Sequence, residues 1–209
     1  MRRLLIAMAL WFAGTLCVPA SAMAGAGIEE ADALIQQGEF GAALEALLPF
    51  AFQGIADAQY KVGVIYDYSQ QAGGRGVPEN PFEAAKWYRK AADQGHARAQ
   101  RNLAACYDAG RGVQADPAAA ARWYRAAALQ GDSFAEFSLG LMYYEGRGVG
   151  QHVDRAYAWL ARARHHGLLP VQRDKANEIL KTIEAGMTPE ELSRAQQMAN
   201  APPGSRLAP

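Results

Sequence analysis

The chain has 209 residues, and half of them are apolar, which is enough to bury one or two small cores. Its 21 basic residues balance its 21 acidic residues. This balance gives no reason to expect a nucleic-acid partner or attachment to a charged membrane surface.

The first 24 residues have the layout of a secretory signal peptide. Arg2 and Arg3 precede an almost wholly apolar run of about 15 residues, and small residues follow up to Ala24. The apolar run is shorter than the roughly 20 residues that span a bilayer, so we expect cleavage after Ala24. The protein is then exported, to the periplasm if the source has an outer membrane and otherwise to the medium. A retained segment that anchors the protein to the membrane is the alternative.

Residues 28–55 predict a partial helix pair. The two helices are expected at Glu29 to Gln37 and at Phe40 to Gln53, and Gly38 separates them.

The middle of the chain repeats with a period of 36 residues. Tryptophan recurs at Trp87, Trp123 and Trp159, and a Gly-Arg-Gly-Val segment starts at Gly74, Gly110 and Gly146. A fixed period of this length is typical of stacked helix pairs. We expect three units, at residues 56–96, 97–132 and 133–168. The first unit is longer because of an insertion near Tyr68 to Gly73.

Each unit has the spacing of two helices joined by the glycine loop. In the second helix of the first unit, Ala84, Trp87, Tyr88 and Ala91 form one apolar stripe. Asn80-Pro81 and Asp116-Pro117 each look like an N-cap followed by proline at the first helical position, whereas the third unit has His152-Val153 there.

These recurring residues resemble the Sel-one-like repeat family, which is related to the tetratricopeptide repeats. The resemblance rests on Ala99-Gln100, Gly110 to Val113, Trp123-Tyr124, Gly131 and their equivalents one period away. It implies an all-α fold, a right-handed α/α superhelix of antiparallel helix pairs. It also implies that the concave face of this solenoid binds a peptide or protein segment.

The C-terminal part predicts capping helices over residues 171–199. A helix is expected from Val171 to Ile183. Thr188-Pro189-Glu190-Glu191 is a capping box that opens a second helix, which runs to about Met198. Residues 200–209 are expected to form a disordered tail.

The sequence shows no pattern typical of a metal, cofactor or catalytic site. The glycine loops lack the Lys-Ser/Thr ending of a nucleotide-binding loop, and the adjacent His165 and His166 lack metal-ligand spacing. Cys106 could be a reactive thiol, a dimerising thiol or a small core residue, and its helical apolar setting favours the last. We therefore expect a non-enzymatic, monomeric scaffold without cofactors. A hydrolase of the penicillin-binding or β-lactamase type is the weaker alternative.

If the helix pairs have tetratricopeptide-like geometry, the first helix of each unit faces inward. The predicted partner-binding residues, four from each unit, are Asp57, Lys61, Val64, Asp67, Arg98, Arg101, Ala105, Asp108, Phe134, Ser138, Leu141 and Tyr144. Charge lies toward the first two units and apolar surface toward the third, so we expect an apolar anchor of the partner near Phe134 and Leu141. The alternative partner is cell-wall glycan, for a peptidoglycan-associated module or an accessory of an envelope enzyme. For glycan the surplus aromatics would be Tyr68 and Tyr144.

Overall fold

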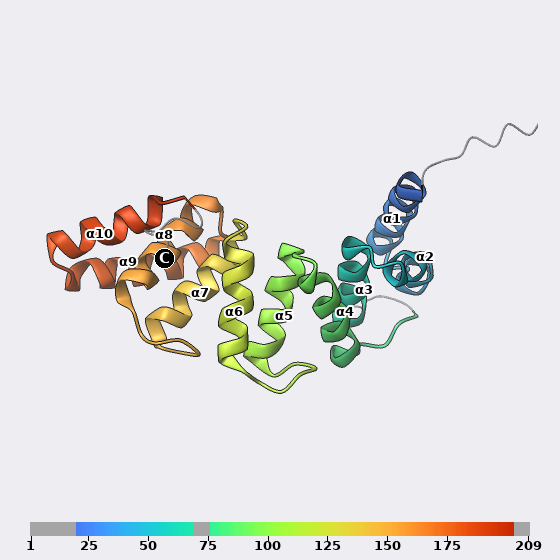
Figure 1. Cartoon of the computed structure of the whole chain (residues 1–209), viewed down its shortest axis with the longest axis horizontal. Coiled ribbons are helices and arrows are strands. Elements are labelled where there is room, and N and C mark those ends of the chain that lie inside the picture. Colours follow the sequence, from blue (N-terminus) through green and yellow to red (C-terminus); the bar gives the residue numbers. More distant parts are fainter. Residues whose placement is uncertain (1–19, 69–75, 203–209) are drawn as a thin grey trace, which may run out of the picture.

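The computed structural model describes residues 20–68 and 76–202, and within these ranges the chain forms ten helices and no strand (Figure 1). The helices are α1 (Ala20–Gln36), α2 (Phe40–Phe52), α3 (Ala56–Tyr68), α4 (Pro81–Asp93), α5 (Ala97–Ala109), α6 (Pro117–Ala128), α7 (Ser133–Glu145), α8 (Val153–His166), α9 (Pro170–Gly186) and α10 (Pro189–Asn200). None of these helices is long and apolar enough to cross a bilayer.

Consecutive helices from α1 to α9 pack side by side along an elongated stack (Figure 1). The closest packing lies within the pairs α3–α4, α5–α6 and α7–α8, and the pairs join through α4–α5 and α6–α7. The predicted all-α solenoid of helix pairs is therefore confirmed. We call α3, α5 and α7 the first helices of their units, and α4, α6 and α8 the second helices.

The second helices begin where the proline pattern predicts. The Asn80 side chain accepts a hydrogen bond from the Glu83 amide at 3.2 Å, and Asp116 accepts one from the Ala119 amide at 2.9 Å. A proline occupies the first turn in both helices. His152 precedes α8 without a side-chain capping bond, as its weaker signal suggested. Local sequence therefore fixes these helix starts before any unit stacks on another.

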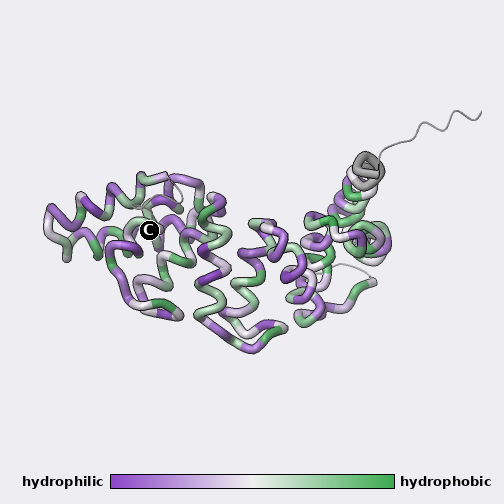
Figure 2. Tube along the Cα trace, in the orientation of Figure 1, coloured by the Kyte–Doolittle hydropathy of each residue, from purple (hydrophilic) through white to green (hydrophobic). Residues whose placement is uncertain are grey.

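Small residues bring the two helices of a unit close together, and aromatic residues fill the space around them. Tyr88 and Trp159 are fully buried. A Cβ added to Gly63 would lie 2.6 Å from the Tyr88 ring, so no larger residue fits there without a shift. Hydrophobic and hydrophilic positions alternate along the helices (Figure 2), because each helix turns one side to its neighbours.

The glycine loops join neighbouring units. Gly112 has a φ of +70°, and a Cβ added to it would lie 2.0 Å from the carbonyl oxygen of Pro81, at the start of α4. Gly148 lies in the same way on Pro117, one unit further along, at 2.2 Å. Each loop thus rests on the second helix of the preceding unit, which supports the connector role over phosphate binding.

The two ends differ from expectation in their boundaries. Helix α1 begins at Ala20, earlier than the predicted Glu29, so the expected cleavage after Ala24 falls within it. At the other end the predicted capping box at Thr188 is present, and α10 packs against α8. Residues 200 and 201 do not belong to the expected tail, because Asn200 ends α10 and Ala201 is buried. The apolar run of the signal peptide, most of the insertion after Tyr68, and residues 203–209 lie outside the described residues.

Candidate interaction site on the first helices

The twelve predicted partner-binding residues lie on the three first helices, and most of them fall into three environments. We call the surface that they mark the first-helix face. Four lie on each of α3, α5 and α7. One group is held in polar contacts near α3, a second is engaged in pairs between units, and a third borders an open groove.

Near α3 the polar side chains bind one another. Lys61 Nζ lies 2.5 Å from Asp32 Oδ2 on α1 and 3.2 Å from Asp57 Oδ2. His96 Nε2 lies 3.6 Å from Asp57 Oδ1, and its ring stacks on Tyr60 with 4.7 Å between centroids. Hydrogen bonding to His96, with the charge of Lys61, lowers the pKa of Asp57. Val64 is half-buried beside this network, in the core around α4 and α5.

Asp67 is buried, contrary to the prediction that it faces a partner. Only 4% of the residue is exposed. Its carboxylate accepts a hydrogen bond from the Tyr88 hydroxyl at 3.1 Å. Arg111 Nη2 lies 2.6 Å from Asp67 Oδ1, a close ion pair whose N–H is not aligned for a hydrogen bond. Burial raises the pKa of Asp67 against the opposing charge of Arg111.

The pair between Asp67 and Arg111 recurs one unit further along. Arg147 lies in the same position of the next glycine loop and pairs with Asp108, the equivalent of Asp67 on α5. The arginines of the second and third Gly-Arg-Gly loops thus reach back to the first helix of the preceding unit. In the third unit Tyr144 takes the aspartate's place.

A ladder of buried amides, which sequence reasoning missed, also links the units. Gln59 donates to the Ala51 carbonyl at 3.0 Å and accepts from Gln94 at 2.7 Å. Gln100 likewise donates to Ala92 at 3.2 Å and accepts from Gln130 at 2.8 Å. The signal was present in the sequence, because these glutamines recur in register with the repeat.

In the third unit charged residues replace the amides. Glu136 takes the register position of Gln100 and is fully buried, and His166 takes that of Gln130. The Glu136 carboxylate accepts a hydrogen bond from Arg162 Nε at 3.3 Å and lies 2.9 Å from His166 Nδ1. Burial raises the pKa of Glu136, although His166 and Arg162 oppose the effect. Arg162 also donates to the Ala201 carbonyl at 2.8 Å. This buried cluster ties the third unit to the end of α10.

An open groove of about 430 Å³ lies along the first-helix face, and we call it the α5–α7–α9 groove. Three of the predicted residues, Arg101, Ala105 and Phe134, line it. The structure adds Tyr68 from α3 and Leu169, which precedes α9. Phe134 is 39% exposed and Leu169 is 69% exposed. Apolar side chains this open to water are available for contact with a partner.

The remaining predicted residues of α7 lie elsewhere. Leu141 is half-buried against the C-terminal core, so it cannot serve as the open anchor that the sequence suggested. Ser138 is partly buried. Tyr144 lines a separate cavity of about 510 Å³, where it lies with His152 and Arg194. Of the two residues predicted near the anchor, Phe134 is exposed and Leu141 is half-buried.

Arg101 is the charged residue of the groove. Its Nη1 lies 3.0 Å from Asp132 Oδ2, and its guanidinium carbon lies 6.0 Å from the Phe134 ring centroid. Asp132 is also the N-cap of α7, because it accepts a hydrogen bond from the Ala135 amide at 2.9 Å. The start of α7 thus positions both the arginine and the aromatic ring.

Comparison with known proteins agrees with this architecture. The model of the Sel1 repeat matches residues 56–96, 97–132 and 133–175. The crystal structure of a Sel1 repeat protein from Oxalobacter formigenes is similar, with 34% sequence identity and a TM-score of 0.55 over 66% of this chain and 97% of that chain. The structure of c5321, a protective antigen of uropathogenic Escherichia coli with an SLR fold, shows 27% identity and a TM-score of 0.53. That match covers 84% of this chain but only 44% of c5321. A search of curated proteins finds no match. The chain belongs to the Sel1 repeat family, whose members are generally non-catalytic scaffolds for protein–protein interactions.

Proposed function

We propose that this protein is an exported scaffold that holds a peptide segment of a partner protein in the α5–α7–α9 groove. The observation that carries the proposal is the exposure of Phe134 and Leu169 at one groove. Arg101 lies beside them in an ion pair that orients its guanidinium. Exposed apolar side chains beside an oriented polar group are typical of interaction sites.

The fold supports this choice of surface. The charged side chains near α3 and between the units already form ion pairs within the protein. They therefore have few hydrogen-bonding groups left for a partner. The groove is lined by residues of the three first helices α3, α5 and α7 and by residues around the start of α9. An extended segment can contact several units at once on such a surface.

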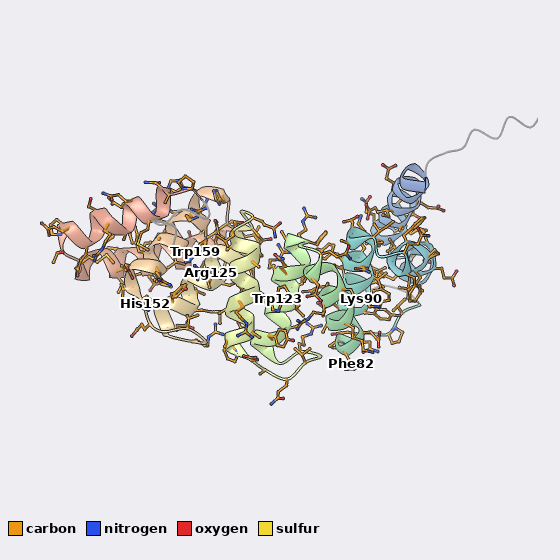
Figure 3. The ribbon with its side chains drawn as sticks, in the orientation of Figure 1. Phe82, Lys90, Trp123, Arg125, His152 and Trp159 are labelled. Carbon is orange, nitrogen blue, oxygen red and sulfur yellow. The ribbon has the colours of Figure 1, made fainter. Side chains whose placement is uncertain are left out.

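The groove is tested with a photo-crosslinking residue in cells of the source organism. p-Benzoylphenylalanine replaces Phe134 in one variant and Phe82 in a control. Phe82 is 57% exposed and lies at the lower edge of α4 (Figure 3). We expect discrete adducts from position 134 only, and weaker ones when Leu169→Glu is added. Equal adducts from both positions, or none from position 134, would contradict the proposal.

Export rests on the first 24 residues, where a basic start, an apolar run and small residues follow one another. The measurement is the intact mass of the protein purified from the source organism's envelope fraction. We expect a chain that begins at Gly25. A retained start at Met1, or recovery in the cytosolic fraction, would contradict export with cleavage.

A further inference from the structure

We propose that the α5–α7–α9 groove selects segments in which an acidic side chain lies next to a bulky apolar one. This inference rests on the proposed function, because it names the chemistry of the segment that the same groove would hold. The apolar residue would lie against Phe134 and Leu169, and the carboxylate would face Arg98 and Arg101.

The charges at the groove are unequal. The residues that line it include Arg101 and neither aspartate nor glutamate. Asp132, the partner of Arg101, has only 9% of its side chain exposed, whereas 28% of the Arg101 side chain is exposed. The carboxylate of Asp132 is also engaged by the Ala135 amide. The Asp132 carboxylate is therefore turned away from water, and the exposed part of the Arg101 guanidinium leaves positive charge at the groove.

Arg98 adds a second positive charge on α5 near the groove, although it is not among the residues that line it. Arg98 and Arg101 are three residues apart on α5, so they lie on one face of the helix. Arg98 also holds the register position on α5 that Phe134 holds on α7, one period of the repeat away. It is exposed and forms no ion pair with any residue that the structure describes. Cationic and aromatic side chains thus lie at equivalent positions of neighbouring first helices.

Two aspartates at the ends of α3 and α5 are already paired with arginines. Asp67 pairs with Arg111, and Asp108 pairs with Arg147. A basic segment would therefore meet Arg98, which has no carboxylate partner among the described residues, and Arg101, whose partner Asp132 is turned away from water, while an acidic segment would gain charge-assisted hydrogen bonds. Because charges across an interface mainly decide which partners are accepted, the asymmetry favours an acidic segment.

The test uses a displayed library of random peptides, selected on the purified mature protein. We expect the selected peptides to carry Asp or Glu next to Phe, Leu, Ile, Met or Trp. Binding of a selected peptide should weaken about tenfold in Arg98→Glu, the loss of about one charge-assisted hydrogen bond. It should also weaken with added salt. Arg122→Glu is the matched control, because Arg122 is an exposed arginine on the second helix α6.

The outcomes separate this inference from the proposed function. Peptides that need Phe134 and Leu169, but are enriched in Lys or Arg or show no charge preference, would overturn the inference and leave the scaffold proposal standing. Selection of no peptide, or of peptides that bind equally to Phe134→Glu/Leu169→Glu, would overturn both. Circular dichroism of each variant shows whether it is folded. Arg98→Gln gives a second, milder variant for which about half of the loss in binding free energy is expected.

Discussion

Cys106 lies buried on α5, only 4% exposed, and packs in the core between the first and second units. Burial, with the charge of Asp67 nearby, raises the pKa of its thiol to about 12. The thiolate is the reactive form of cysteine, so the residue serves packing rather than chemistry. This agrees with the core role that its helical apolar setting predicts.

We expect the folded protein to resist alkylation at Cys106. At pH 8 the thiolate fraction would be about three orders of magnitude below that of a free cysteine, because the pKa is raised. Iodoacetamide labelling, followed by mass spectrometry, should be slow in buffer and fast in concentrated urea. Rapid labelling of the native chain, or a disulfide-linked dimer under mild oxidation, would show that the thiol is accessible.

Glu136 is the residue at which the third unit departs furthest from the amide ladder. It is fully buried, and Arg162 beside it has only 8% of its side chain exposed. We expect Glu136→Gln to lower the free energy of unfolding by about 3 kcal/mol, because it leaves Arg162 buried without its carboxylate. Urea denaturation monitored by circular dichroism measures this loss.

The control for this prediction comes from the second unit. A triple variant gives the third unit the residues that the second unit has one period earlier, Gln100, Ala126 and Gln130. Its substitutions are Glu136→Gln, Arg162→Ala and His166→Gln. The triple variant should be more stable than Glu136→Gln, since an amide pair replaces the charged cluster and no charge is left buried. The recovery should be partial, because the contact of Arg162 with the Ala201 carbonyl is also lost. If the triple variant were no more stable than the single one, Arg162 would not be the source of the cost.

At the scale of the element, the glycine loop is the part whose geometry joins the units. Gly112→Ala should cost more than about 3 kcal/mol, because its Cβ would clash with the Pro81 carbonyl and its φ of +70° is already unfavourable for alanine. Gly95→Ala is the matched control. It has a φ of +88° but nothing within 4 Å of an added Cβ, so we expect only about 1–2 kcal/mol. Thermal melts of both variants compare the two losses of stability. Equal losses would mean that the contact of the loop with the start of α4 does not limit the residue at position 112.

Helix starts could be predicted from the sequence, because the interactions that make them are local. Asn80 and Asp116 cap a helix whose first residue is only one position away. The glycine loops could be located for the same reason. The residues that the loop arginines contact could not be predicted, because Arg111 pairs with Asp67, which lies 44 residues earlier in the chain. The repeat shows which positions are equivalent, but not which residue of the next unit each one touches.

For the whole molecule, the C-terminal end shows how the repeat stops. Gln172 on α9 continues the register of Gln59, Gln100 and Glu136. Its Oε1 is buried without a hydrogen-bond partner among the described residues. In the complete units this acceptor receives a donor from the second helix of the same unit. Here α10 packs against α8 instead of pairing with α9, so the donor is missing. The sequence predicted capping helices but not this return, which depends on Arg162 binding the Ala201 carbonyl.

This arrangement makes α10 a cap that can loosen without loss of the rest of the stack. Within α10 only Ala195 is fully buried, while Leu192 and Ala199 pack partly buried against the C-terminal core, so the contact of Arg162 with Ala201 is a substantial part of what holds the helix. We expect Arg162→Ala to raise deuterium uptake in α10 and at the N-terminal end of α7, where Glu136 lies, and to leave α3 unchanged. The reason is that each unit of a linear stack contacts only its neighbours, so stability is lost locally. The control is Arg164→Ala, which removes an exposed arginine from α8, the helix that carries Arg162. It should leave deuterium uptake in α10 and in α7 unchanged. Uptake that rose equally in α3 and α10 would instead mean that the stack unfolds as one cooperative unit and that α10 is an integral part of it.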